Sequence, residues 1–373
     1  MLHLYYPLSL TFLVLAVVAA AMFRRLGLPL AAWIVALAVP LSLGMYLLPQ
    51  PDFVTSTLGV GAFTLAAALG VFGFVEFLIL RPLGSFRLGA MARITYYEAL
   101  FQPLTLILLG VGALAILLLA FMPFFTLSED NKMYRDVAVS LVFLFTLPVM
   151  IFASTKVIDE EIENRTMLTL MSKPIARWQV VVGKYVGVAL VCMVLVTVLG
   201  IIASSCAYAR YFDDMSIDFR LADAAAFKAL YLGNLKANLA FVPALLLQFM
   251  QIATLAAVSV AVSTRYGLVL NITVVVLLYI AANLARYAGA YHLPQPFAAL
   301  ATILAHLLPG LGFMDLNQRL LFGQYNYGTE AVEGIPSYSQ IWQYTALACV
   351  YAMLYISAVI SFAIAAFRTR ELT

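Results

Sequence analysis

Long apolar stretches, separated by short polar segments, dominate this chain. A helix needs about 20 apolar residues to cross a hydrocarbon core of about 30 Å, and nine stretches approach or exceed that length. They are Leu4–Phe23, Pro29–Leu48, Phe53–Leu80, Pro103–Phe125, Val137–Thr155, Val180–Tyr208, Leu239–Ser263, Gly267–Ala285 and Ile341–Phe367. The pattern predicts an all-α polytopic membrane protein with helices that cross the bilayer repeatedly.

The composition supports the same class. The 373 residues are 64% hydrophobic and only 10% charged, and the mean hydropathy is +1.00. Soluble domains carry about 25% charged residues, so this chain has too few charges to cover a surface in water. The net charge of +3 does not indicate a nucleic-acid partner. The three cysteines, Cys192, Cys206 and Cys349, lie in apolar runs without paired spacing, so neither a disulfide framework nor a metal site is indicated.

The basic residues predict an orientation. Arg24 and Arg25 follow the first run, and no basic residue precedes it. A secretory signal peptide has the reverse layout, so we expect a retained helix with the N-terminus outside. If every run crosses, 13 of the 21 Lys and Arg residues fall on the inner side and 8 on the outer side. This bias follows the positive-inside rule and places the C-terminus in the cytoplasm.

One segment between the third and fourth runs has amphipathic spacing. Its apolar residues recur at steps of four, four, three and four: Phe86, Ala90, Ile94, Tyr97 and Phe101. The opposite side of the same helix carries Arg87, Glu98 and Gln102. This pattern is typical of a helix that lies at the membrane interface. The alternative is a cytoplasmic extension of the fourth span.

The outer segment 292–338 contains two apolar stretches that are too short to cross a membrane. These are Ala298–Leu308 and Leu311–Phe322, and Pro309 and Gly310 separate them. We expect a pair of short helices that dip into the outer leaflet, since irregular backbone at that depth must be covered by protein. Pro309 and Gly310 would supply the reversal between the two helices.

The cytoplasmic segment 159–177 between the fifth and sixth runs is the most informative. Acidic residues gather at its start, where a helix N-terminus favours negative charge, and Pro174 ends the helix after Lys173. We expect a short helix whose charged end projects from the membrane towards a partner. The alternative is a solvated loop.

The residues of this segment carry a resemblance to a known family. The pattern Glu-x-Glu-x-x-Thr, a Leu, Ser-Lys-Pro-x-x-Arg and then Gly-Lys resembles the coupling loop of type-2 ATP-binding-cassette (ABC) exporter permeases. It looks most like the branch of permeases from copper-enzyme maturation systems. The matching residues are Glu161, Glu163, Thr166, Pro174, Arg177, Gly183 and Lys184. One departure is Arg165, because the family usually has Gly immediately before the Thr.

The resemblance implies an organisation for the whole chain. An accessory bundle of about three spans (1–82) would precede an amphipathic connector helix (83–102) and a six-span permease core (103–373). The loop 159–177 would be the coupling helix that docks on the ATPase, with Glu160, Arg165 and Lys173 contributing to the same surface. The resemblance also implies a cell (inner) membrane location and a second permease subunit, which gives a homodimer or heterodimer. Pro309 and Gly310 would lie at an outer gate.

The sequence assigns ATP to the partner subunit. It has no G-x-x-x-x-G-K-[ST] phosphate loop, since Gly183-Lys184 is followed by Tyr185 and lacks the earlier Gly. We therefore expect a permease subunit that binds no cofactor itself and needs a separate ABC ATPase.

Two other functions fit a chain of this composition less well. A membrane-embedded enzyme would need ionisable residues grouped inside the bilayer, but Glu76 is the one carboxylate well inside a run, and His306 has no partner at ligand spacing. An ion-coupled carrier or channel would need charges or broken helices at the midplane, and the apolar runs of this chain are unusually free of both. We therefore expect a permease.

Overall fold

A computed structural model describes residues 53–84, 86–122, 130–163, 176–214, 224–285, 308–315 and 338–368. Over these ranges the chain is helical and contains no strand. The prediction of an all-α polytopic membrane protein is confirmed. The first two predicted spans, Leu4–Phe23 and Pro29–Leu48, lie outside the described residues.

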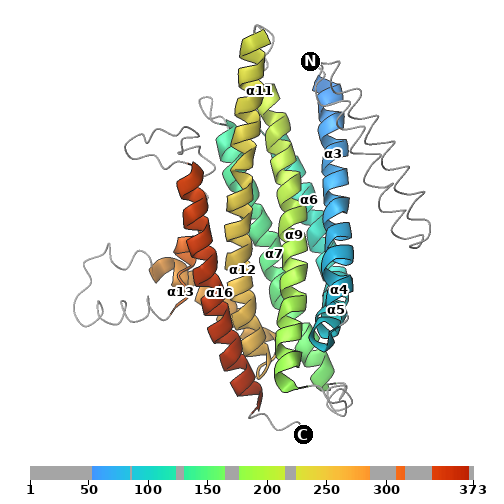
Figure 1. Cartoon of the computed structure of the whole chain (residues 1–373), viewed down its shortest axis with the longest axis vertical. Helices are drawn as coiled ribbons and strands as arrows, with labels where there is room; N and C mark the ends of the chain where they lie inside the picture. The colour runs from blue at the N-terminus through green and yellow to red at the C-terminus, as the bar shows by residue number, and fades with distance from the viewer. Residues whose placement is uncertain are drawn as a thin grey trace, which may run out of the picture.

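Figure 1 shows the described helices as a bundle whose longest members run along one common direction. In chain order the elements are α3 (Phe53–Phe74), the π-helix η2 (Val75–Leu80), α4 (Arg81–Leu83), α5 (Arg87–Leu100), α6 (Pro103–Phe121), α7 (Asp130–Glu163), α9 (Arg177–Asp214), α11 (Ala224–Leu239), α12 (Phe241–Ser263), α13 (Leu268–Ala285), the 3-10 turn η3 (Leu311–Met314) and α16 (Tyr338–Arg368).

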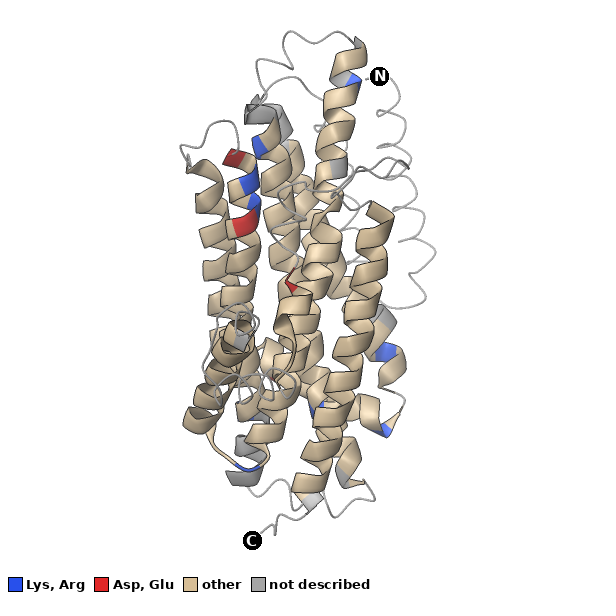
Figure 2. Cartoon of the chain, turned by 90° about the vertical axis from the view of Figure 1, so that its left-hand side faces the viewer, with Lys and Arg blue, Asp and Glu red and all other residues tan. Residues whose placement is uncertain are grey.

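Five stretches of described helix are long and apolar enough to cross a membrane. They are Pro103–Phe121, Asp130–Lys156, Trp178–Tyr211, Lys228–Ser263 and Tyr338–Phe367. Two shorter apolar helices, Gly59–Phe74 and Leu268–Leu284, coincide with the third and eighth predicted runs. Figure 2 shows the described Lys, Arg, Asp and Glu mainly towards the two ends of the bundle, as a membrane-spanning protein requires.

Helix α9 forms the centre of the bundle. It packs against α5, α7, α12, α3 and α6, and its side chains at Val191, Cys192, Leu195 and Leu199 are fully buried. Helix α12 lies between α9 and α16, and it contacts both. The faces left uncovered are strongly apolar, for example Val269 of α13 at 80% exposure and Leu347 of α16 at 70%. Such faces suit lipid rather than water.

The seventh predicted span begins earlier than expected and is broken. The sequence placed its start at Leu239, but the helical path includes α11 and then a turn at Ala240 before α12. Pro243 explains the break, because proline lacks the N–H that would bond the carbonyl four residues earlier. That carbonyl, on Leu239, instead accepts a hydrogen bond from the hydroxyl of Tyr338 at 3.4 Å.

Helix α7 begins at one end of the bundle, the Asp130 end, and finishes at the other, the Glu163 end. Polar side chains tie the helices together at the Asp130 end. The guanidinium of Arg210 on α9 donates to the carbonyls of Leu119 and Ala120, which close α6, at 3.3 and 3.1 Å. It also lies 3.5 Å from a carboxylate oxygen of Asp130. Cations at a helix C-terminus are favourable, so Arg210 holds α6, α7 and α9 in register.

Candidate coupling site

The acidic residues of the predicted coupling segment lie on the last turns of α7. Glu160, Glu161 and Glu163 continue the helix that begins at Asp130. The sequence pattern placed them at the start of a separate short helix, and this expectation was wrong in its local structure. The reason is that no Pro or Gly interrupts the chain between Val149 and Glu163, so the backbone hydrogen-bond ladder continues past the apolar residues.

The rest of the segment is described only in part. Arg165, Thr166, Lys173 and Pro174 lie outside the described residues, and Arg177 is the first residue of α9. The role of these residues in coupling therefore stays a prediction.

A buried polar contact joins three helices just before the acidic turns. The side-chain amide of Asn271 on α13 donates to Thr155 Oγ1 on α7 at 2.7 Å and to Ser259 Oγ on α12 at 2.8 Å. All three residues are buried. Thr155 lies one turn before Asp159 along α7, so this contact fixes the acidic turns relative to α12 and α13.

The structure places Gly183 and Lys184 inside the bundle. Gly183 faces α5 so closely that an added Cβ would lie 2.8 Å from Met91 Cβ, and Lys184 is only 2% exposed. Because both residues are buried, neither presents a surface on which a partner could dock directly. Their part in coupling stays a prediction.

Gly187 continues the same contact one turn further along α9. A Cβ at Gly187 would lie 2.5 Å from Thr95 Cβ and 2.8 Å from the carbonyl oxygen of Ala92, both on α5. Spacing of small residues by four positions is the known device for close approach of helices in membranes. The sequence analysis missed this function of Gly183, although the Gly183-x-x-x-Gly187 spacing was its signal.

Helix α5 itself has two distinct faces. The face that packs on α9 includes the compact residues Ala92 and Thr95, together with Met91. The predicted amphipathic stripe points elsewhere, since Phe86, Ile94 and Phe101 are 70%, 60% and 66% exposed. Helix α5 also ends at Leu100, and Gln102 has extended backbone before α6 begins at Pro103. It is therefore separate from the fourth span, while its place at a membrane interface stays a prediction.

Glu76 joins η2 to α5. Its carboxylate accepts a hydrogen bond from the Tyr97 hydroxyl and lies 3.7 Å from the Arg93 guanidinium, which sits 5.6 Å from the centre of the Tyr97 ring. Burial and the hydrogen bond to Glu76 raise the pKa of Tyr97 above its ordinary value. Tyr97 therefore remains a protonated donor at neutral pH. The arrangement supports a structural role for Glu76.

At the other predicted site, Pro309 and Gly310 form a tight turn. Gly310 has φ −71° and ψ 65°, and the Leu311 N–H donates to the Pro309 carbonyl at 2.7 Å. These are the features of an inverse γ-turn. The Gly310 N–H donates to Tyr351 Oη of α16 at 2.9 Å, and Leu311 and Met314 are buried.

The first residues of the predicted helix Leu311–Phe322 are not α-helical. Leu311–Met314 forms one 3-10 turn, and Asp315 has non-helical backbone with φ −104° and ψ 81°. Gly312 and Asp315 both favour a turn over a helix. The remaining residues, 316–322, lie outside the described residues. Most of the predicted first short helix, Ala298–Leu308, lies outside the described residues.

A family model described as "ABC-2 family transporter protein" matches residues 120–372, which is more than half of the chain. The chain belongs to the ABC-2 transporter family. The match begins at the end of α6 and extends through α16, so it includes the acidic end of α7 and the turn at Pro309. No curated protein and no solved structure matches the chain.

This family supports a coarse statement of function. The protein is a multi-pass ABC-2 permease, the membrane component of an ABC transporter. Such permeases are generally not catalytic themselves and work with an ABC ATPase.

Proposed function

We propose that this ABC-2 permease is the subunit of an exporter whose Glu163 end faces the cytoplasm and docks on a separate ATPase. One observation carries the proposal: α7 is a single helix that spans the apolar bundle and then continues past it. Its membrane-spanning part ends at Lys156, and the helix continues to Glu163. At about 1.5 Å per residue, its acidic end projects about 10 Å beyond the span.

The contacts around α7 explain how docking would be transmitted. The acidic turns are part of the same rigid helix as Thr155, and Asn271 links that residue to α13 while Ser259 lies on α12. A force on the acidic turns therefore moves α7, α12 and α13 together. Interfaces and packed cores switch between discrete arrangements, which supports a coupled motion of these helices when the ATPase binds ATP.

Reversing the charge of the acidic turns tests whether they dock on the ATPase. Opposite charges at a docking surface steer and register a partner. We expect Glu161→Lys and Glu163→Lys to insert normally but to co-purify less ATPase than the wild type. The permease is tagged, solubilised in mild detergent and captured, and the ATPase is recognised by its phosphate-loop sequence.

The control is Lys228→Glu, a charge reversal of an exposed residue on α11 at the Asp130 end. We expect this variant to retain the full ATPase yield. Equal yields from the wild type and both Glu variants would contradict docking at the acidic turns.

The proposal also includes the branch of the family, the direction of transport, the second permease subunit and the orientation in the membrane. The likeness of the loop 159–177 to permeases of copper-enzyme maturation systems supports that branch, export and a second permease subunit. The distribution of Lys and Arg supports a cell (inner) membrane location with the N-terminus outside.

We place the outer gate at Pro309 and Gly310. Their turn rests on α16 through Tyr351 Oη, and Tyr344 Oη donates to the Phe313 carbonyl at 2.8 Å. η3 also contacts α12 and α13. A turn held by α12, α13 and α16 would move when those helices move, as a gate requires.

A further inference from the structure

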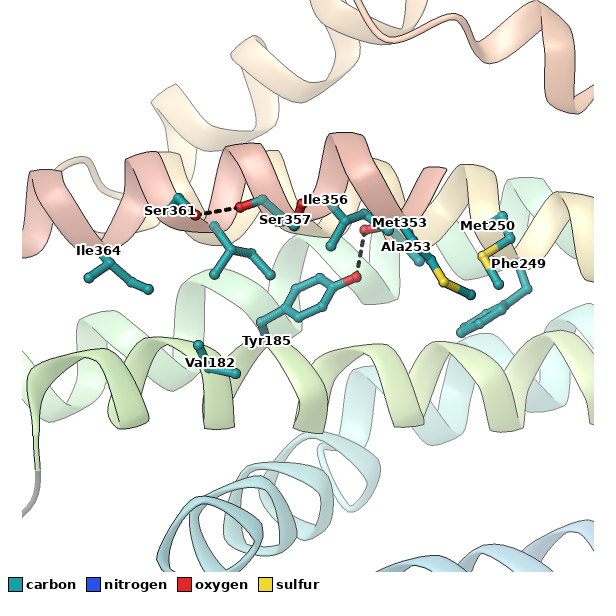
Figure 3. A pocket seen from close by; sticks show the side chains of 11 residues that line it. Val182, Tyr185, Phe249, Met250, Ala253, Met353, Ile356, Ser357, Ser361 and Ile364 are labelled. Atoms are coloured by element: carbon teal, nitrogen blue, oxygen red, sulfur yellow. Dashed lines mark hydrogen bonds between the residues drawn. The ribbon is translucent and has the colours of Figure 1, made fainter. Parts of the chain in front are cut away.

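A pocket opens between α9, α12 and α16 at a place that the proposed coupling does not use. Its volume is about 490 Å³. Figure 3 shows its walls, which include Val182 and Tyr185 of α9, Phe249 and Met250 of α12, and Ile356 and Ile364 of α16. Nearly all of these side chains are apolar.

The few polar groups in the walls are already hydrogen-bonded within the protein. Tyr185 Oη donates to the Ala253 carbonyl at 3.3 Å, and Ser361 Oγ donates to the Ser357 carbonyl at 2.7 Å (Figure 3). Ser357 Oγ donates to the Leu354 carbonyl at 2.7 Å. Water needs several polar partners to occupy a cavity, and these walls offer few. The chemistry therefore favours an apolar occupant.

The dimensions of the pocket match one acyl chain. Along α16 it extends from Met353 to Ile364, which corresponds to about 16 Å at 1.5 Å per residue. The hydrocarbon of one leaflet is about 15 Å thick, half of the bilayer core. Ile364 lies three residues before Phe367, where the apolar span ends. The pocket thus runs from mid-membrane to the headgroup level at the Glu163 end.

A cation lies at that headgroup level. Arg265 follows α12 and is exposed, and its guanidinium donates to the carbonyl of Ala366 at 3.2 Å. Ala366 is two residues beyond Ile364, the pocket residue nearest the end of α16. Arginine is well suited to bind phosphate. The pocket and Arg265 together present an apolar slot that ends at a basic group.

We propose that this site binds one anionic phospholipid of the leaflet at the Glu163 end, with an acyl chain in the pocket and the phosphate on Arg265. The lipid would fill the space between α16 and the pair α9 and α12. This proposal does not depend on the docking of an ATPase, because it uses only residues of this chain and the depth of the spans.

The experiment counts bound lipid by native mass spectrometry. The purified full-length chain is delipidated in detergent and titrated with dioleoyl phosphatidylglycerol or with dioleoyl phosphatidylcholine, which has the same chains and no net charge. We expect the wild type to retain one phosphatidylglycerol more tightly than phosphatidylcholine. Arg265→Gln should weaken phosphatidylglycerol binding about fivefold, the effect of one basic residue at an anionic surface, and leave phosphatidylcholine unchanged.

Variants that fill the pocket with a larger side chain test whether an acyl chain binds there. Ile360→Trp should weaken both lipids, whereas the control Ile280→Trp, at a 47% exposed residue of α13, should not. If Ile360→Trp does not yield folded protein, Met353→Trp narrows the pocket from a residue that is 57% exposed. Unchanged lipid retention in the pocket variants, or no preference for phosphatidylglycerol in the wild type, would overturn the proposal.

Discussion

Gly187 offers a sharp test of how α5 is attached to the bundle. An alanine there would place its Cβ 2.5 Å from Thr95 Cβ, 2.6 Å from Thr95 Cγ2 and 2.8 Å from the Ala92 carbonyl oxygen. The last atom belongs to the backbone of α5, so rotating one side chain cannot relieve the contact. Helix α5 must move away from α9.

The expected change in the free energy of unfolding follows from two opposing effects. Overpacking a tight contact costs about 1–3 kcal/mol, while replacing Gly by Ala inside a helix gains about 0.8–1 kcal/mol. The variant Gly110→Ala isolates the second term, because an added Cβ at Gly110 of α6 meets nothing within 4 Å. We expect Gly110→Ala to be slightly more stable than the wild type and Gly187→Ala to be about 1–3 kcal/mol less stable than Gly110→Ala.

The assay is the free energy of unfolding in mixed detergent micelles, titrated with a denaturing detergent. Thr95→Gly in the Gly187→Ala background should restore part of the loss, because it removes Thr95 Cβ and Cγ2 but leaves the Ala92 carbonyl in place. If Gly187→Ala and Gly110→Ala are equally stable, α5 does not pack on α9 as described.

Three further outcomes are expected. For the contact of α7 with α13, a double-mutant cycle of Asn271→Leu and Thr155→Val should give a coupling energy of about 0.6 kcal/mol, the mean for such bonds in membranes, and a value of zero would contradict the bond. Tyr97→Phe should lower stability by less than about 1 kcal/mol, because its partner Glu76 is part-exposed. Since the pKa of Tyr97 is raised above 10.0, that difference should stay constant from about pH 6 to 9 and shrink only above about pH 10, so a difference that falls between pH 6 and 9 would contradict the assignment of Tyr97 as donor. Replacing Pro309 and Gly310 together by alanine should leave ATPase yield intact and slow ATP hydrolysis by the complex; wild-type hydrolysis would argue against a gate, and lost assembly would make the turn structural.

Run length was a good guide to the spanning helices whose ends coincide with a change of polarity. The eighth and ninth runs, Gly267–Ala285 and Ile341–Phe367, agree with α13 and α16 within a few residues. Hydropathy detects the part of a helix that lies in hydrocarbon, and here that part is almost the whole helix.

The same reasoning was less accurate where helices leave the membrane. Helix α7 continues past Thr155 to Glu163, and α9 continues past Tyr208 to Asp214. Hydropathy falls at these points, but the backbone hydrogen bonds continue until a residue breaks them. This difference placed the acidic residues on the end of a spanning helix, which the sequence pattern alone did not reveal.

Contacts between distant segments were the least predictable part. The amphipathic stripe predicted a helix at the position of α5, but the face that packs on α9 through Ala92 and Thr95 carries no stripe of large apolar residues and is not visible in that pattern. Glu76 has Arg81 as its nearest basic residue along the chain, whereas its partners in the structure are Arg93 and Tyr97 on α5. Such pairs depend on tertiary packing, which one sequence without its structure does not specify.

Cross-linking from the end of α7 tests the central claim most directly. A photoreactive phenylalanine analogue replaces Glu163 in the tagged full-length chain, and a second version carries it at exposed Lys228 on α11. Membranes that contain the native partners are irradiated, and the adducts are identified by mass spectrometry. The account predicts an adduct with an ABC ATPase from position 163 and none from position 228. An ATPase adduct from position 228 alone would contradict it.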